Sequence, residues 1–471
     1  MSVTTEQPEI TADVLYQWRL MRDADAGNAR IHSYDARITR SQTQFQRKNG
    51  DIDDGQSMLY NTYLPIPGGF IANWASGGQA MWVSYLKRAQ FPEIIAPAVN
   101  AMTGIIHKSE WQIEMPDSMR YLWENATEDG ATLEAFSRRI TRELLLMGRY
   151  TLSVDSPEGS GDPYMIGHQA ETLINWDKNF YVFNESGMVR NGFDWEEQIK
   201  YRIYELDESG NYVQMLVDAN GDPLAEPIYP QGAAGPLKYV PIVVAGARDL
   251  TTNVEEPPLI GAADGALAVY RLDADYRHQL YMSGQETLVM DNAEAPAAIG
   301  PAVALEINST SDNPAKAYYV SPTCAGIEAH RVAINEGWEY AARAGAKLFD
   351  SGSAVESGEA RRMRQNAEAA TLQTIANTGA AALEQALKYV ADMQGANPDD
   401  VIVVPPRNLL DAPMTSKEVL DFVNAYKAGG ISWKTMYENL QRGQIASNER
   451  DSDEELSIMN MDTVEVDSSA L

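Results

Sequence analysis

Three arginines form the one local departure from an acidic background: Arg361, Arg362 and Arg364. They follow a stretch rich in serine and glycine, residues 350–356 (DSGSAVE), which interrupts two alanine-rich helical patterns without any proline. Guanidinium groups bind carboxylates and phosphates through paired hydrogen bonds, so this cluster could contact an anionic partner. It could equally be a solvated helix face whose charge is balanced by neighbouring glutamates such as Glu359.

The other residues capable of chemistry are scattered. A phosphate loop ending in Gly-Lys-Ser/Thr is absent, and GGFIANWASGG (68–78) lacks both the lysine and a preceding strand. The five histidines include no pair at three- or four-residue spacing, and a single cysteine, Cys324, completes no zinc set. The Gly-x-Ser-x-Gly elbow of serine hydrolases is also missing. We therefore expect no enzymatic activity, no cofactor and no metal site.

Two acidic clusters could in principle bind a divalent cation, ELDESGN (205–211) and DSDEELS (451–457). Neither has the regular spacing of oxygen ligands that a calcium loop requires. We interpret both as solvated loops.

Composition limits the possible partners. The formal charge is −30, from 67 acidic and 37 basic residues, which argues against a surface that grips nucleic-acid phosphates. With 471 residues, 44% of them hydrophobic, the chain should form two to four ordered units. We see no secretory signal and no run of 18 apolar residues, and Cys324 fits a reducing compartment, so a soluble cytoplasmic product is expected.

Hydrophobic periodicity predicts an α+β chain that is mostly α-helical. The helix 133–149 is the clearest, because apolar residues follow one stripe and Gly148 can end it. That stripe consists of Leu133, Phe136, Ile140, Leu144 and Met147. Other helical patterns cover 11–46, 78–91, 94–108, 257–282, 325–349 and 357–394, with two short helices capped by Ser416 and Ser432.

Details of these patterns give further expectations. In 78–91, Met81, Tyr85 and Ala89 should share one face, and Pro97 should lie in the first turn of the next helix. The alanines of 357–394 suit either close packing between long helices or an ordinary buried helix.

Between the helices, the periodicity changes to two. Residues 150–155 predict a strand, residues 164–246 a small antiparallel β region, and residues 284–323 an irregular segment with short strands. The last 25 residues are strongly acidic, and we expect them to be disordered.

Several segments, taken in order, resemble the portal proteins of tailed bacteriophages, in particular a portal family first catalogued as a domain of unknown function. The segments are YLPIPGG, YLKRAQFPEIIAPAVNAMTGIIHKSEW, LLLMGRYTLSVDSPEG, PYMIGHQAETLINW, AKLFDSGSAVESGEARRMRQNAEAATLQTIANTGAAALEQAL and AGGISWKTMYENLQRGQI. They extend over nearly the whole chain. The sequence departs from the family pattern in its first 50 residues and in the length of its acidic tail.

The resemblance implies a portal fold with wing, two-helix stem, clip and helical crown, assembled as a ring. The expected boundaries are 1–256 for the N-terminal arm and α/β wing, 257–283 for the first stem helix, 284–324 for the clip, 325–349 for the second stem helix, 350–357 for the tunnel loop, 358–396 for the long wing helix, 397–446 for the crown and 447–471 for an acidic, disordered tail.

The resemblance also implies a role. Such rings, normally of twelve subunits, occupy one capsid vertex, and double-stranded DNA is packaged and ejected through the channel without sequence recognition. Expected partners are the terminase large subunit, a head-tail adaptor, and the major capsid and scaffolding proteins, with no membrane. Assembly would take place in the host cytoplasm and the final location would be the virion. A ring of negatively charged chains would repel phosphates and guide DNA without holding it.

By the same resemblance, the serine- and glycine-rich stretch is the tunnel loop nearest the DNA. Its expected DNA-facing residues are Asp350, Ser351, Gly352, Ser353, Ala354, Val355 and Glu356. Residues expected to flank the loop or to contact a neighbouring subunit are Lys347, Glu359, Arg361, Arg362 and Arg364.

Two alternatives stay open. The chain could be another capsid or head-completion protein, although long paired helices flanking an inserted segment favour the portal. It could also be an enzyme such as a nuclease, if the scattered acids converged on a metal.

Overall fold

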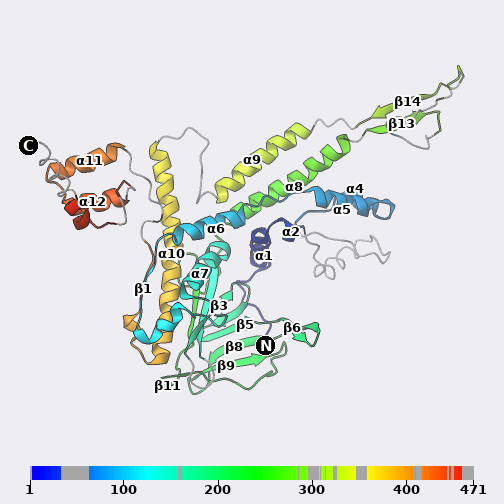
Figure 1. Ribbon diagram of the computed structural model, residues 1–471. Helices are drawn as coiled ribbons and strands as arrows, with labels where there is room; N and C mark the ends of the chain where they lie inside the picture. Colours follow the sequence, from blue (N-terminus) through cyan, green and yellow to red (C-terminus); the bar gives the residue numbers. More distant parts are fainter. Residues whose placement is uncertain are drawn as a thin grey trace, which may run out of the picture. The chain divides into compact units, whose positions relative to one another are not determined.

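The computed structural model describes residues 3–32, 63–156, 162–284, 286–294, 307, 309–312, 314–321, 326–345, 358–406, 409, 416–442, 445–446 and 450–458. The chain divides into two compact units, one formed by 1–356 with 374–405 and the other by 357–373 with 406–471. The first unit contains both helices and sheets, and the described part of the second is helical (Figure 1). The expected α+β class is confirmed.

Helix α7 (Leu133–Met147) forms the centre of the α-rich part of the first unit. Thr132 caps it by accepting a hydrogen bond from the Ala135 backbone N–H, and Gly148 ends it with φ of 69°. All five residues of the predicted stripe are buried. The sequence prediction for this helix is confirmed.

Other helices complete this part of the unit, and α1 and α6 pack against α7. They are α1 (Ala12–Ala26), α2 (Asn28–Ile31), α4 (Gly68–Ala72), η1 (Trp74–Ser76), α5 (Gly78–Arg88), α6 (Ile95–Ile106) and η2 (Asp117–Trp123). Pro97 lies in the first turn of α6, as expected. The predicted face of α5 is wrong at Met81, which is 42% exposed, because Trp82, Tyr85 and Leu86 are the residues that turn inward.

Two antiparallel sheets make up the β region, with strand orders β12-β2-β3 and β4-β5-β8-β9. Their strands are β2 (Arg149–Asp155), β3 (Tyr164–Gln169), β4 (Leu173–Asp177), β5 (Phe180–Asn184), β8 (Tyr201–Leu206), β9 (Tyr212–Val217) and β12 (Ile242–Gly246). The predicted strand 150–155 and the predicted β region 164–246 are therefore confirmed.

Three small strand pairs complete the sheets of this part. They are β1 (Gln112–Glu114) with β15 (Ile402–Val404), β6 (Gly187–Asn191) with β7 (Asp194–Gln198), and β10 (Gln231–Gly232) with β11 (Gly235–Pro236). The first pair joins segments almost 300 residues apart in the chain.

Helix α10 (Gly358–Gln394) crosses from the second unit into the first. In the part that belongs to the first unit, Gly379 lies close enough that an added Cβ would be 3.7 Å from Ile140 and 3.8 Å from Leu144 of α7. Its alanines 376, 380, 382, 386 and 391 are buried. Of the two interpretations of this alanine-rich segment, the ordinary buried helix accounts for residues 374–394.

The second unit contains α11 (Ser416–Lys427) and α12 (Trp433–Arg442). Ser432 caps α12 as predicted, because its hydroxyl accepts a hydrogen bond from the Thr435 N–H. An η3 turn (Pro398–Asp400) precedes β15 in the first unit.

The expectation of a disordered tail is wrong for residues 450–458. Residues 452–458 are helical, and the Trp433 indole N–H donates to the Ser452 carbonyl at 2.8 Å. The Asp451 carboxylate caps this helix by accepting from the Asp453 and Glu454 N–H groups, both at 2.8 Å. Acidic residues are favourable at a helix N-terminus, so the local charge that suggested disorder stabilises structure here. Residues 459–471 lie outside the described residues.

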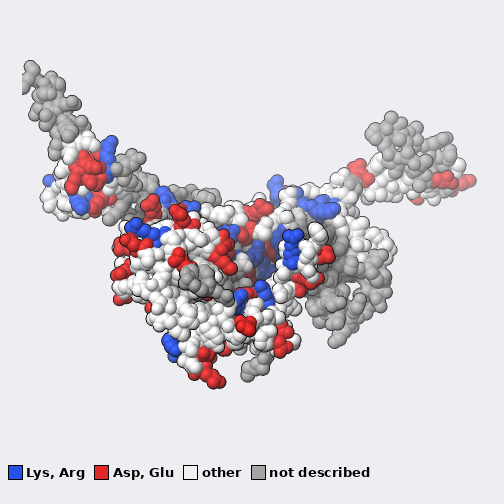
Figure 2. Space-filling model, turned by 60° about the horizontal axis from the view of Figure 1, so that its bottom comes forward, with Lys and Arg blue, Asp and Glu red and all other residues white. Residues whose placement is uncertain are grey.

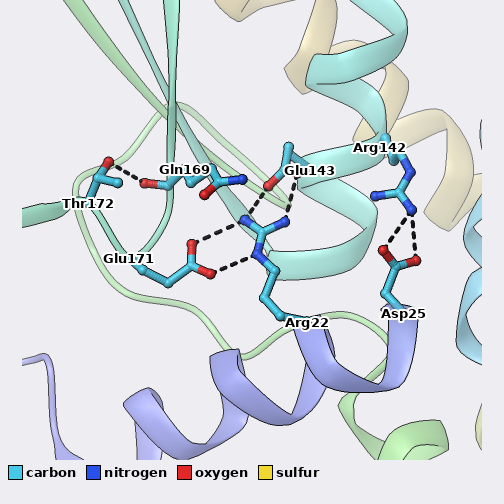
Figure 3. A network of polar contacts seen from close by, with 7 residues as sticks. All are labelled: Arg22, Asp25, Arg142, Glu143, Gln169, Glu171 and Thr172. Atoms are coloured by element: carbon cyan, nitrogen blue, oxygen red, sulfur yellow. Dashed lines mark hydrogen bonds and ion pairs between the residues drawn. The ribbon is translucent and has the colours of Figure 1, made fainter. Parts of the chain in front are cut away.

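Helix α1 is held by a polar network (Figure 3). Arg22 donates to both oxygens of Glu143 on α7, at 2.8 and 2.6 Å, and to both oxygens of Glu171 in the turn between β3 and β4, at 2.7 and 3.1 Å. Beside it, Arg142 pairs with Asp25 at 2.7 Å. Bidentate arginine pairs fix direction as well as distance, so the network joins α1, α7 and the β region.

His168 is enclosed by the β region. One ring nitrogen is 2.8 Å from the Ser153 hydroxyl, and the ring lies 4.2 Å from that of Phe183. Burial disfavours the charged form and lowers the pKa of His168 to about 4. Burial also lowers the pKa of His107, which stacks on Trp111, to about 4. Both histidines are thus partly buried and neutral at pH 7.

His168→Gln should remove part of the acid sensitivity of the fold. Because the folded-state pKa lies below the ordinary value of about 6.5, the stabilisation is complete above pH ~6.5 and is lost as the pH falls toward 4. The cited shift corresponds to roughly 3 kcal/mol at most. Urea midpoints from pH 8 to pH 4 should fall less steeply in the variant, even if it is weaker at pH 8. Parallel curves would contradict the assignment.

Candidate functional site: a helix pair carrying a strand hairpin

The segment 260–345 forms a helix, a strand hairpin and a returning helix. These are α8 (Ile260–Ser283), β13 (Thr287–Asp291), β14 (Lys316–Val320) and α9 (Ile327–Gly345). The two helices lie side by side and β13 pairs antiparallel with β14 (Figure 1). This order agrees with the predicted helix, irregular segment and helix. Of the predicted strand around 303–307, only Ile307 belongs to the described residues.

Small residues let the helices approach closely. A Cβ added to Gly265 would lie 2.7 Å from the Cβ and 2.8 Å from the Cα of Ala341. One added to Gly337 would lie 2.8 Å from a methyl of Val269. These pairs run in opposite directions along the two helices, so α8 and α9 are antiparallel. A distance below 3.0 Å leaves no room for a side chain unless the backbones move apart.

The sequence contained a signal for this contact that periodicity alone did not reveal. Gly261 and Gly265 are four residues apart, and so are Gly337 and Ala341, which places each pair on one helix face. Small residues at this spacing are the usual way for two helices to pack at short distance.

Helix α8 is anchored in the core from its start to about Arg277. The Tyr85 hydroxyl donates to Asp275 at 2.6 Å, and Asp273 accepts from the Gln90 N–H at 2.8 Å and from Arg277 at 2.7 Å. Beyond this point the helix is increasingly exposed. Tyr281 is 41% exposed, and the Arg88 guanidinium lies 4.0 Å from its ring centre.

The outer surfaces of the helix pair and hairpin carry large apolar side chains. Tyr340 is 62% exposed, Tyr319 54% and Trp338 42%. Others in the same group are Leu280, Met282, Tyr318, Val320 and Val332. An accumulation of such side chains on one projecting element is typical of a surface that contacts another protein.

The structure does not test the predicted tunnel-loop site. Lys347 and residues 350–356 (Asp350, Ser351, Gly352, Ser353, Ala354, Val355 and Glu356) lie outside the described residues. Glu359, Arg361, Arg362 and Arg364 belong to α10, whose backbone is described there but whose side chains are not. The role of all these residues stays a prediction.

In both acidic clusters an aspartate accepts hydrogen bonds from nearby backbone N–H groups. The Asp207 carboxylate accepts from the Ser209 and Asn211 N–H groups at 2.8 Å, and the bond from Asn211 lowers the pKa of Asp207. Asp451 caps a helix in the same way, as described above. Among the described residues, no group of three or more histidine, cysteine or acidic side chains is placed to hold a metal ion. None of the described helices combines the length and hydropathy of a membrane span.

Comparison with known proteins gives one family match. Residues 258–394 match the model described as "Domain of unknown function (DUF4055)". This segment runs from the start of α8 to the end of α10 and is less than half of the chain, so it does not by itself assign the whole chain to that family. No curated protein is similar enough to count as a match.

Solved structures similar to the chain come from gene transfer agent (GTA) particles. A chain from the neck of a native GTA particle computed with C12 symmetry is 11% identical, with 76% of this chain and 92% of that chain covered and a TM-score of 0.37. A chain from the neck of an empty particle computed with C6 symmetry is 12% identical, with 76% of this chain and 93% of that chain covered and a TM-score of 0.38. A chain from the virion of the native particle is 12% identical, with 79% of this chain and 98% of that chain covered and a TM-score of 0.37. With TM-scores below 0.5, these likenesses establish neither a shared fold nor a shared role.

Gly265→Ala and Gly261→Ala should have opposite effects. At Gly265 the new methyl group meets the backbone of Ala341, so the helices must separate, at a cost of roughly 1–3 kcal/mol. At Gly261 the nearest atom would be the Cβ of Ala344 at 3.5 Å, an ordinary contact, and alanine should stabilise the helix by up to about 1 kcal/mol. Chemical unfolding measures both. Equal stability of the two variants would show that the close contact is absent.

Proposed function

We propose that the chain is a portal-type subunit, which assembles side by side into a ring at the vertex of a phage-like particle and forms the channel for double-stranded DNA. The observation that carries this proposal is the antiparallel pair α8–α9, tightly packed along its inner face and bearing a strand hairpin at its far end. Its outer faces are rich in exposed apolar residues. In this arrangement α8 and α9 are the stem and the hairpin is the clip.

Charge supports side-by-side packing of copies. Helix α9 exposes Trp338, and it exposes Glu336 and Glu339 on other parts of its surface. On the other side of the helix pair, α5 packs against α8. Lys87 of α5 and Arg271 of α8 are exposed there. A copy that packs its α9 against the α5–α8 side of the next copy would bring opposite charges together and cover the apolar residues. A contact between two different surfaces repeats from copy to copy and generates a ring when the rotation closes.

The net charge suits a passage for DNA. On the face shown in Figure 2, acidic and basic side chains are interspersed, and the described residues there form no continuous basic band. Together with the net charge of −30, this favours a surface that lets phosphates pass without binding them. Docking of terminase and of a head-tail adaptor, assembly in the host cytoplasm and a place at the portal vertex of the virion belong to the same proposal.

Another capsid or head-completion protein stays the alternative. Such a protein would also need exposed apolar faces for assembly, but would form rings or shells without passing DNA. The two are distinguished by whether the ring has a central opening wide enough for a duplex.

Electron microscopy of the purified protein should show rings of about twelve subunits around an opening that admits duplex DNA. Trp338→Glu should abolish or strongly reduce the rings, because it replaces a large exposed apolar side chain with a carboxylate where the neighbour must pack. Leu224→Glu, a residue 45% exposed in the β region, is the control and should leave ring formation intact.

A stable monomer at high concentration would overturn the portal proposal. Closed rings or shells without a central opening would favour the head-completion alternative. Rings that form equally well with Trp338→Glu would leave the portal role standing but show that α9 does not make the contact.

The triple substitution of Arg361, Arg362 and Arg364 by alanine should impair ring assembly or DNA packaging. We expect these arginines to pair with carboxylates of their own or a neighbouring subunit, and less with phosphate, because an acidic chain offers many such partners. The readouts are the proportion of rings in electron micrographs and the amount of nuclease-protected DNA in assembled particles. Unchanged assembly and packaging would remove the proposed role of the cluster.

A further inference from the structure

Strands β6 and β7 form a hairpin that, among the described strands, pairs with no third one. Every residue of both strands is exposed, and Figure 1 shows β6 at one side of the β region. In the two-residue turn between the strands, Gly192 has φ of 65°, a conformation that favours glycine. The hairpin thus projects from the fold without being covered by it.

The base of the hairpin is fixed to the four-stranded sheet. The Glu185 N–H donates to the Lys200 carbonyl at 3.0 Å, and the Lys200 N–H donates to the Ser186 hydroxyl at 3.1 Å. Arg202 of β8 donates to both oxygens of Glu185, at 2.6 and 3.1 Å. A bidentate pair fixes direction, so the hairpin leaves the sheet at a defined angle.

Large apolar side chains are exposed along the hairpin. Phe193 in the turn is 98% exposed, Trp195 62% and Met188 58%. Val189 and Ile199 are exposed as well. Apolar side chains gathered on a projecting element are typical of a surface that contacts another protein, and aromatic residues are enriched in such surfaces.

The backbone of the hairpin offers open strand edges. Each strand of a two-stranded sheet pairs along one edge only, so the outward N–H and C=O groups of the other edge are left over. Within the described part of the chain, none of those of β6 or β7 bonds to the backbone of another segment. An extended peptide can add a third strand to such an edge through main-chain hydrogen bonds.

The two edges differ in charge. Because side chains alternate along a strand, β7 carries Asp194 and Glu196 on one face and Trp195 and Glu197 on the other. Glu196 accepts a hydrogen bond from the Asn191 amide at 3.1 Å, but none of the three carboxylates forms an ion pair with a described residue. Strand β6 has no acidic residue.

This charge decides between possible occupants. A second copy of β7 would place carboxylates opposite carboxylates, which destabilises strand pairing, and that copy carries a net charge of −30. Lysine or arginine side chains opposite Asp194 and Glu196 would stabilise the pairing, and an apolar side chain could cover Trp195.

We infer that the outer edge of β7 binds an extended segment of a basic protein, which adds a third strand to the hairpin. Basic side chains of that segment face Asp194 and Glu196, and apolar ones on its other face pack against Trp195. The inference concerns one hairpin of one chain and does not depend on ring formation.

The test uses the full chain and a dye-labelled synthetic peptide of alternating lysine and valine, with binding followed by fluorescence anisotropy. Because the edge is short, we expect weak binding, with a Kd on the order of 0.1 mM. A peptide with proline in place of each valine keeps the charge but cannot form the strand hydrogen bonds, and it should bind at least about tenfold more weakly. A peptide with glutamate in place of each lysine should not bind.

Variants of the hairpin identify the binding edge. Asp194→Lys combined with Glu196→Lys should reverse the preference, so that the glutamate peptide binds and the lysine peptide does not. The matched control combines Glu124→Lys with Glu226→Lys, which makes the same change of charge at two exposed acids outside the hairpin. This control should bind the lysine peptide like the unchanged protein.

The inference would be overturned if the unchanged protein did not bind the lysine–valine peptide at about 1 mM. Equal affinity for the proline peptide would also overturn it, because attraction between charges alone would then explain binding. So would equal loss of affinity in the hairpin variant and its control. A change of oligomeric state in Trp195→Ser, measured by sedimentation velocity, would identify a second copy as the occupant and reject the basic partner.

Discussion

The close contact between α8 and α9 is the constraint on which the rest of the projecting segment depends. Because Gly265 faces the backbone of Ala341, and Gly337 faces Val269, the two helices hold one register along their length. That register fixes where the chain leaves α8 for the hairpin β13–β14 and where it returns. It also decides which side chains remain outside, since the inner faces are occupied by small residues. The exposed apolar surfaces on which the proposed assembly rests are thus a consequence of close packing inside.

Arginine has two contrasting structural roles in this acidic chain. Arg22 joins α1 to α7 and to the turn after β3 through two carboxylates, and it is fully paired. Arg149 is more deeply buried and has an aromatic ring and one weak carbonyl contact in place of a carboxylate. The desolvation cost is similar in kind for both, but only the first is compensated by carboxylates that bond to it directly. Paired arginines such as Arg22 also take up carboxylates internally, while most of the negative charge stays in contact with solvent.

Long elements with strong periodicity could be predicted. The buried face of a shorter helix and the structure of the acidic tail could be predicted less well. The stripe of α7 and the cap at Ser432 followed from spacing and residue type, because helix burial and capping depend on neighbours three or four residues away. The face of α5 was misjudged at Met81, since the choice between adjacent faces depends on what packs against the helix. The helix at 452–458 does not follow from the acidic composition of the tail, because Asp451 stabilises the helix start through hydrogen bonds that depend on local geometry.

The sequence by itself determined the class of fold, the order of a helix, an irregular segment with short strands and a second helix, and the absence of a phosphate-loop motif, because each of these depends on residues near one another in the chain. Only the tertiary structure decided that the polar face of β2 is buried, that β1 pairs with β15, and that Gly265 lies against Ala341. These features depend on contacts between segments far apart in sequence. A single strand or helix carries the pattern of its two faces, but what covers each face is set by the partner that the fold brings to it.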